Sequence, residues 1–337
     1  MSALLPATTS TDSSAISRNV GPLHEAQQVQ RRLRLGLWLG LLGVVIFAAT
    51  LPLTKLAVGT PSAPQLSPWF ITFGRAAVAG LLSFLYLTIQ YHRGLARIPT
   101  LKQCGLVVFT ACGVVVGFPL FMSLALQVVP STHGAVVTGL LPLATAVVAA
   151  VWFRQKPSIG FWICAVAGTL LVLAYMGIRS SDVAGHFSFH LADGFLLLAM
   201  MSAALGYIGG ARLTPVLGAE QVICWVLVMA LPLTLPMTWL NTPPDLHAIH
   251  ASSWWAFAYL AIFSMWIGFF AWYRGLAWGG AVRVSQVQLV QPFLSLLFAV
   301  PLLGEALDAT TIGFGLAVIV TVFIGKKMPV NLTGEKK

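Results

Sequence analysis

The amino-acid sequence predicts an all-α polytopic membrane protein, with ten transmembrane helices arranged as two inverted five-helix repeats. Only 8% of the 337 residues are charged and 58% are hydrophobic, whereas roughly a quarter of the residues in a soluble domain are charged. Ten uncharged apolar runs have the length, about 17 to 25 residues, that crosses a bilayer. These observations exclude a soluble enzyme, a nucleic-acid-binding module and a secreted disulfide scaffold.

The ten predicted helices follow one another closely, five in each half of the chain. They are expected at residues 35–58, 69–90, 104–127, 134–153, 159–178, 192–210, 221–240, 254–276, 282–303 and 310–324. The residues before the first helix are rich in Ser, Thr and Gln and hold no apolar core of a signal peptide. We therefore expect this N-terminal segment to be a disordered tail.

The distribution of Lys and Arg predicts the side of the membrane that each loop faces, because cytoplasmic loops carry the excess of positive charge. With the N-terminus inside, 16 of these side chains fall on the inner side and three, Lys55, Arg75 and Arg179, on the outer side. We expect a multi-pass protein of the inner membrane with both termini in the cytoplasm. The predicted organisation is a disordered cytoplasmic tail at 1–34, a first repeat at 35–178, a periplasmic linker at 179–191, a second repeat at 192–325 and a cytoplasmic tail at 326–337.

The two halves show signs of an inverted repeat. Because each half has an odd number of helices, two copies of one fold must enter the membrane in opposite directions. Pro142 and Pro292 lie 150 residues apart, each inside the fourth helix of its half. The turn after that helix carries Arg154 and Lys156 in the first half but Glu305 and Asp308 in the second, as opposite orientation requires.

Several short motifs occur in a characteristic order and spacing. In the first half they are Leu51-Pro52-Leu53-Thr54-Lys55-Leu56-Ala57, Ser67-Pro68-Trp69 followed by Arg75, and Ala125-Leu126 leading to Pro142. In the second half they are Gly275-Leu276-Ala277, Gln291-Pro292-Phe293, Leu303-Gly304-Glu305 and a last helix with spaced glycines. From about residue 35 to 324 the chain thus resembles the drug/metabolite transporter superfamily, specifically the ten-helix EamA-type exporters. The resemblance implies two EamA-type five-helix repeats and a transport function. The first half of the chain departs from the family in one place, since it has Arg154-Gln155-Lys156 where family members commonly have a Gly-Glu pair.

Prolines inside two helices indicate a binding site. A proline leaves the carbonyl four residues before it without its helical partner, here the carbonyls of Thr138 and Gln288. Paired helix interruptions are the best sequence indicator of a transporter's binding site. We predict that Pro142 and Pro292 are helix-kink or gating residues and that Thr138 binds substrate; the alternative is that each proline only bends its helix for packing.

Other polar and aromatic side chains complete the predicted substrate-binding set. Ser285, Gln288 and Gln291 share one face of the ninth helix at about 100° per residue, although such amides can also simply bond neighbouring helices. Arg75 lies roughly 10 Å inside its helix, which favours a position facing protein or an aqueous cavity. Tyr207 and Trp266 lie on helices that the resemblance implies border the central cavity, with interfacial anchoring as the alternative.

The positions of the charged residues narrow the expected substrate. No Asp or Glu lies in the middle of a predicted helix, whereas transporters of cations usually keep an intramembrane carboxylate. Cationic drugs are therefore disfavoured, and we expect a neutral, zwitterionic or anionic metabolite such as an amino acid. His133, at the start of the fourth helix, could titrate near neutrality, with a plain interfacial histidine as the favoured interpretation.

The predicted function is secondary transport by alternating access, in the direction of export. An importer or exchanger is the alternative, and a multidrug efflux protein or an intramembrane enzyme fits the sequence less well. No catalytic residue or cofactor is expected. No metal is expected either, because the histidines in the loops are better explained as ordinary loop residues. The expected partners are a small-molecule metabolite and the lipid bilayer, not nucleic acid; proton coupling and the choice between monomer and homodimer are left open.

Overall fold

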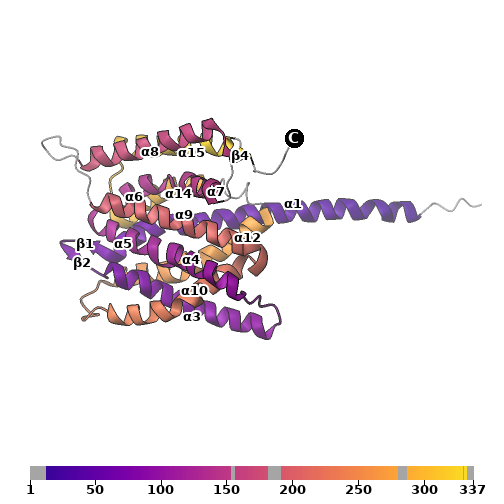
Figure 1. The fold of residues 1–337 in the computed structure, drawn as a ribbon, viewed down its shortest axis with the longest axis horizontal. Helices are drawn as coiled ribbons and strands as arrows, with labels where there is room; N and C mark the ends of the chain where they lie inside the picture. Colours follow the sequence, from indigo (N-terminus) through magenta and orange to yellow (C-terminus); the bar gives the residue numbers. More distant parts are fainter. Residues whose placement is uncertain (1–12, 153–155, 181–190, 280–286, 329, 332–337) are drawn as a thin grey trace, which may run out of the picture.

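The computed structural model describes residues 13–152, 156–180, 191–279, 287–328 and 330–331, and shows a bundle of roughly parallel helices (Figure 1). Within the described residues, eight helical segments are long and apolar enough to cross a bilayer, and two shorter apolar helices lie at Gln288–Leu303 and Ala309–Gly325. Each segment coincides with one of the predicted helices. The prediction of an all-α polytopic membrane protein is confirmed.

The helices of the first half run from the N-terminus to Ser180. They are α1 (Ser13–Ala48), α2 (Thr50–Val58), α3 (Pro68–His92), α4 (Leu101–Ala111), the π-helical η1 (Cys112–Gly117), α5 (Phe118–Val128), α6 (Ser131–Thr138), α7 (Leu141–Trp152) and α8 (Ile159–Ser180). Helix α1 begins well before residue 35, so part of the segment predicted to be disordered is helical. Its Glu, Ala, Gln, Leu and Arg residues are good helix formers, and this part of α1 projects beyond the bundle (Figure 1).

The second half repeats much of this pattern. Its elements are α9 (Leu191–Leu217), α10 (Ala219–Leu240), α11 (Ala251–Tyr259), the π-helical η2 (Leu260–Ile267), α12 (Gly268–Gly279), the 3-10 turn η3 (Gln288–Val290), α14 (Gln291–Leu303) and α15 (Ala309–Lys327). A π-helical segment therefore lies in the third membrane segment of each half. Such segments are rare and often occur at functional sites.

Two short antiparallel strand pairs help to define the ends of the bundle. Strand β1 (Gly59–Thr60) pairs with β2 (Ala63–Pro64) at the end that we call the hairpin end. The opposite end, where α1 projects beyond the bundle, is called the tail end (Figure 1). Strand β3 (Lys156–Pro157) pairs with β4 (Val330–Asn331) and joins the turn before α8 to the segment after α15.

The main helix pairs join one half of the chain to the other. The first segment of the first half, α1, packs on the third segment of the second half, α12. In the same way α9, the first segment of the second half, packs on α5 of the third segment of the first half. The second segments α3 and α10 pack on each other, as do α6 with α14 and α8 with α15 (Figure 1).

Among the described residues, the helix is interrupted shortly before a proline in the first segment of the first half and in the fourth segment of each half. Helices α6 and α7 are separated at residues 139–140, and Pro142 is the second residue of α7. Pro292 is likewise the second residue of α14, after the 3-10 turn. In the first segment α1 gives way to α2 before Pro52, and the carbonyl of Ala48, four residues before that proline, accepts a hydrogen bond of 2.8 Å from Ser295 Oγ. A buried side chain from another helix thus satisfies the carbonyl that the proline leaves free.

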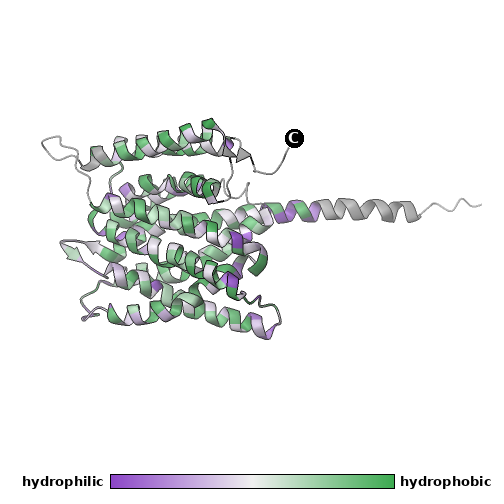
Figure 2. Cartoon of the chain, in the orientation of Figure 1, coloured by the Kyte–Doolittle hydropathy of each residue, from purple (hydrophilic) through white to green (hydrophobic). Residues whose placement is uncertain are grey.

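The outer surface of the bundle is apolar, as a lipid-facing surface must be. Large hydrophobic side chains are exposed along the helices, among them Leu85, Ile163, Leu170 and Leu297. Figure 2 shows hydrophobic residues along the length of the helices and hydrophilic residues gathered near the two ends of the bundle. This distribution matches an apolar core of the membrane between two polar interfaces.

Candidate functional site

A central cavity lies between the interrupted helices, enclosed by segments of both halves. Polar and apolar side chains share its wall, as in most small-molecule sites. The lining residues are Phe47, Thr50, Leu51, Arg75, Val114, Phe118, Thr138, Leu141, Tyr207, Ser264, Met265, Phe269, Gln288, Gln291, Pro292 and Ser295. They come from α1, α2, α3, η1, α5, α6, α7, α9, η2, α12, η3 and α14.

Three polar side chains meet on one wall of the cavity. Arg75 of α3 donates from Nη2 to Ser264 Oγ of η2 at 3.2 Å and lies 3.5 Å from Met265 Sδ. The Ser264 hydroxyl is also 2.8 Å from Thr50 Oγ1 of α2. The three residues therefore form a buried chain of hydrogen bonds that fixes the position of the Arg75 guanidinium.

Arg75 is the charged group among the described residues that line this cavity. It is only 3% exposed, and its Nε has no hydrogen-bond partner among the described residues. Within the described part of the chain no carboxylate lies within 4.0 Å of its guanidinium. A buried cation is costly unless it is paired and fully hydrogen-bonded, so the guanidinium has capacity for an additional anionic or strongly polar partner.

Another part of the cavity wall comes from the points where the fourth segment of each half is interrupted. Thr138 is the last residue of α6, and its Oγ1 donates to the carbonyl of Gly134 at 2.7 Å. Gln288 begins the 3-10 turn, and Gln291 begins the helix that follows it. The interruptions thus place two amides and a hydroxyl among the residues that line the cavity.

Most of the residues that the sequence singled out come together here. Arg75, Thr138, Tyr207, Gln288, Gln291 and Pro292 all line the cavity. Pro142 is the residue after the lining residue Leu141. Ser285 lies outside the described residues.

Trp266 is placed elsewhere. Its ring packs on Phe270 with 4.9 Å between ring centroids, and it does not line the cavity. The neighbouring residues Ser264 and Met265 line the wall instead. The reason is geometric: a residue two positions after Ser264 points to nearly the opposite side of a helix.

Three polar residues of the cavity, Thr50, Ser264 and Ser295, were not predicted from the sequence. Ser295 follows Gln291 by one helical turn, so the stripe of the ninth segment could have been extended to it. Thr50 lies two residues before Pro52, so the rule that pointed to the other two prolines could have pointed to this one. Ser264 stands in an apolar run without such a signal, and only its contact with Arg75 reveals it.

The cavity is small in this conformation. Its volume is about 50 Å³, and since one water molecule needs roughly 10–15 Å³ by this measure, it has room for a few waters. A pocket of about 510 Å³ on its tail-end side shares Tyr207 and Gln288 with it. A pocket of about 400 Å³ at the hairpin end, lined by residues that include Lys55 and Glu305, shares no lining residue with it among those described.

Comparisons with known proteins agree with the motifs and with this architecture. The model of the EamA-like transporter family matches residues 34–176 and again residues 190–325. The chain is 41% identical over 290 residues to "Uncharacterized transporter YdeK" of Bacillus subtilis (strain 168), which covers 86% of this chain and 96% of that protein. It is 24% identical over 275 residues to "Uncharacterized transporter YyaM" of the same organism, covering 79% of this chain and 85% of that protein.

A solved crystal structure shows a similar fold. It is 19% identical in sequence, superposes with a TM-score of 0.57, and the match covers 86% of this chain and 95% of the other. The family resemblance drawn from the motifs is confirmed by the match to both halves and by the identity to YdeK. The chain belongs to the EamA-like transporter family.

Proposed function

We propose that the chain is a secondary transporter that exports a small metabolite bearing a carboxylate, such as an amino acid, across the inner membrane. The observation that carries this proposal is the buried Arg75 guanidinium, which lines the central cavity without a carboxylate partner among the described residues. A solute carboxylate would supply that partner. The planar guanidinium can bind a carboxylate with two parallel hydrogen bonds, which a lysine cannot do.

The remaining polar groups suit the rest of such a solute. Gln288, Gln291 and Thr138 offer both donors and acceptors, and Tyr207 and Phe269 offer aromatic surface. No Asp or Glu is among the described lining residues, so a net cationic solute would meet Arg75 without a balancing charge. We therefore favour zwitterionic and anionic solutes over neutral ones and over cationic drugs.

Alternating access between two inverted five-helix repeats is the mechanism we propose. Two observations support the repeats: the family model matches the chain twice, and the pattern of main helix pairs stays the same when the two halves are exchanged. A cavity of about 50 Å³ must widen to admit a metabolite. The interruptions beside Pro142 and Pro292 are where the fourth segment of each half can bend.

The direction of access in this conformation follows from the proposed topology. If the tail end faces the cytoplasm, as the excess of Lys and Arg there indicates, then Tyr207 and Gln288 lie between the solute site and a cytoplasmic pocket. The hairpin end is then periplasmic. The conformation accordingly suits loading of an exported solute from the inside.

The experiment is counterflow transport by the purified protein in proteoliposomes. Unlabelled solute is loaded inside, and uptake of the labelled solute is measured for a panel of amino acids, organic acids and nucleobases. Each carboxylate is compared with its own amide, which keeps the shape and removes the negative charge. We expect saturable counterflow for at least one carboxylate and none for its amide; equal transport of both forms would contradict the role of Arg75.

The direction of transport needs a separate measurement. Efflux of the identified solute from loaded cells is compared between a deletion strain and the same strain carrying the gene. Faster efflux with the gene supports export. Faster accumulation, or efflux only in exchange for external solute, would establish the importer or the exchanger instead.

A further inference from the structure

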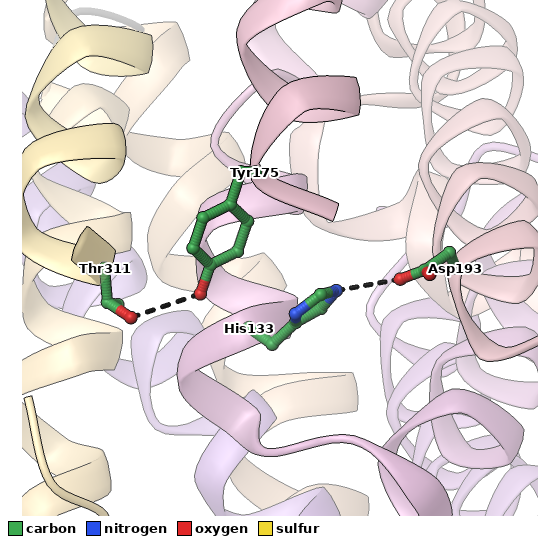
Figure 3. Close-up of polar contacts among 4 residues, drawn as sticks. All are labelled: His133, Tyr175, Asp193 and Thr311. Carbon is green, nitrogen blue, oxygen red and sulfur yellow. Dashed lines mark hydrogen bonds and ion pairs between the residues drawn. The ribbon is translucent and has the colours of Figure 1, made fainter. Parts of the chain in front are cut away.

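A buried histidine–aspartate pair, His133 and Asp193 (Figure 3), lies outside the central cavity. It stands at the starts of α6 and α9, at the hairpin end of the bundle (Figure 1). His133 Nε2 and Asp193 Oδ1 are 2.9 Å apart. The two residues are 5% and 0% exposed, respectively. Burial of both groups in direct contact means that a change in the charge of one is felt by the other almost without screening by solvent.

The pair connects the two helices that carry cavity residues of opposite halves. His133 is the third residue of α6, and Thr138 of the cavity ends the same helix five residues later. Asp193 is in the first turn of α9, and Tyr207 of the cavity lies on the same helix. A force between His133 and Asp193 therefore acts directly on two walls of the proposed solute site.

The surroundings hold the pair in place. The ring of Tyr175 on α8 packs on the His133 ring with 5.1 Å between centroids, and its hydroxyl lies 3.2 Å from Thr311 Oγ1 on α15 (Figure 3). Both oxygens of Glu305 accept hydrogen bonds from the first turn of α6, at 2.7 and 2.9 Å. Among the described residues, the titratable and charged groups at the hairpin end of the elements around α6 are Asp193 of α9, Tyr175 of α8, Lys55 of α2, and Glu305 and Asp308 before α15. Arg179 lies one turn after Tyr175 on α8, with its side chain outside those described. The other charged or titratable residues of α9 and α15, which are Tyr207, Arg212, Lys326 and Lys327, lie farther along those helices.

We propose that His133 and Asp193 form a proton-binding site that couples proton movement to solute transport. This inference rests on the proposed transport function and names its energy source. The described lining of the central cavity holds no carboxylate and no histidine, so a coupling proton needs a site elsewhere. Histidine is the side chain that ordinarily titrates between pH 5 and 8, and this one joins both halves.

The chemical step is simple protonation without electron transfer. The Asp193 carboxylate lies in the first turn of α9, where the helix dipole favours a negative charge. Facing this carboxylate, the neutral imidazole carries its hydrogen on Nε2 and donates it to Oδ1. A proton from the hairpin-end solvent binds the lone pair of Nδ1, and its return to solvent restores the neutral ring.

Protonation changes the strength of the link between the halves. Before protonation the neutral imidazole donates a hydrogen bond to the Asp193 carboxylate. After protonation the same contact joins two opposite charges, and their Coulomb attraction is stronger in a buried site than in water. Helix α6 has only eight residues before its interruption, so it can move as a short rigid unit. Binding a proton therefore favours the conformation in which α6 is held against α9, and loss of the proton releases it.

Amide hydrogen exchange of the purified full chain tests the proton site without any solute. Exchange in peptides from α6 and the start of α9 is compared at about pH 5.5 and pH 8, on either side of the ordinary histidine titration, after correction for the intrinsic rate. We expect wild-type exchange to be slower at the lower pH by at least about threefold, because exchange reports the local opening equilibrium. His133→Gln and Asp193→Asn should each remove this difference.

The control is His247→Gln, a change of an exposed histidine in the loop before α11 at the same end of the bundle. It should keep the wild-type response to pH. The same pH response in His133→Gln as in wild type overturns the proposal. If His133→Gln does not fold, Asp193→Asn carries the test alone, since it preserves shape and removes only the charge.

Proteoliposome transport then tests the coupling. With wild-type protein, a pH gradient should drive net movement of the solute identified by counterflow. His133→Gln should lose this gradient-driven movement by at least about tenfold while keeping counterflow, since counterflow requires no net proton release. Intact gradient-driven transport in His133→Gln, or a wild type indifferent to the gradient, overturns the coupling role. If the wild-type protein shows no counterflow for any solute, the proposed transport function is contradicted instead. The proton site is then tested by the hydrogen-exchange experiment alone.

Discussion

The substitution Arg75→Gln separates a binding role of this arginine from a structural one. Glutamine keeps a polar group near Ser264 but removes the positive charge. Because Arg75 is 3% exposed and has no carboxylate within 4.0 Å among the described residues, its charge costs desolvation energy that no described ion pair offsets. We therefore expect the variant to fold and to unfold at the same temperature as wild type or higher.

Solute binding should respond in the opposite direction. A hydrogen bond to a charged group contributes about 1.5–3 kcal/mol, and each 1.4 kcal/mol changes a dissociation constant about tenfold. Loss of the guanidinium should thus weaken binding of the carboxylate solute roughly 10- to 100-fold. Arg75→Lys keeps the charge but loses the planar pair of donors, so it should lie between the two.

The assay combines counterflow at a series of solute concentrations with thermal unfolding of the same preparation. Arg274→Gln is the matched control, since this arginine lies on α12, is 50% exposed and pairs with Glu220 away from the cavity. The control should leave the half-saturating concentration unchanged. A wild-type half-saturating concentration in Arg75→Gln, or a loss of activity that follows a loss of thermal stability, would refute the binding role.

Five further substitutions test the cavity and the helices around it. Gln288→Ala and Gln291→Ala each remove an uncharged amide from the wall, so each should raise the half-saturating concentration about 3- to 10-fold; unchanged values in both would show that the solute binds elsewhere. Gly275→Ala places a methyl group 2.7 Å from the backbone of α1 and should lower the free energy of unfolding by about 1–3 kcal/mol. Gly313→Ala has nothing within 4 Å of the added methyl group and should raise the free energy of unfolding by up to about 1 kcal/mol. Thermal unfolding of both variants checks this, since Gly275→Ala should melt below Gly313→Ala. Glu305→Ala removes the acceptor of two amides in the first turn of α6 and should speed hydrogen exchange there by about fivefold, for a loss of ~1 kcal/mol; unchanged exchange would mean that solvent replaces the carboxylate.

The hydropathy of the chain alone was enough to predict the membrane fold. In lipid a backbone must satisfy its own hydrogen bonds, so an uncharged apolar run of sufficient length has little choice but to be a helix. The same constraint made the prolines informative. Pro142 and Pro292 predicted interruptions because a missing donor cannot be hidden in hydrocarbon, and the structure has a helix start at each.

Part of the cavity wall was equally accessible to sequence reasoning. Arg75 was too deep in its helix to be an ordinary interfacial cation, and Gln288 and Gln291 were too polar for a face in contact with lipid. These arguments depend on the position of one residue in one helix. They predicted that such a side chain avoids lipid, and the structure brings all three to one cavity.

Partners from distant segments were decided only by the tertiary structure. Ser264 meets Arg75 across 189 residues of chain and Thr50 across 214, and nothing in its own helix marks it out. Trp266 was expected at the cavity, but the rotation of its segment turned Ser264 and Met265 inward instead.

The pairing of His133 with Asp193 is of the same kind. The sequence placed both residues at the ends of predicted helices, His133 just before 134–153 and Asp193 at the start of 192–210, and neither helix by itself indicated that the two would meet. Helix packing determines which side chains meet, because it depends on the fit of all the surfaces at once. The sequence by itself determined which segments enter the membrane and which groups must avoid lipid; the tertiary structure decided which of those groups face one another, since that choice is made by contacts between helices rather than within them.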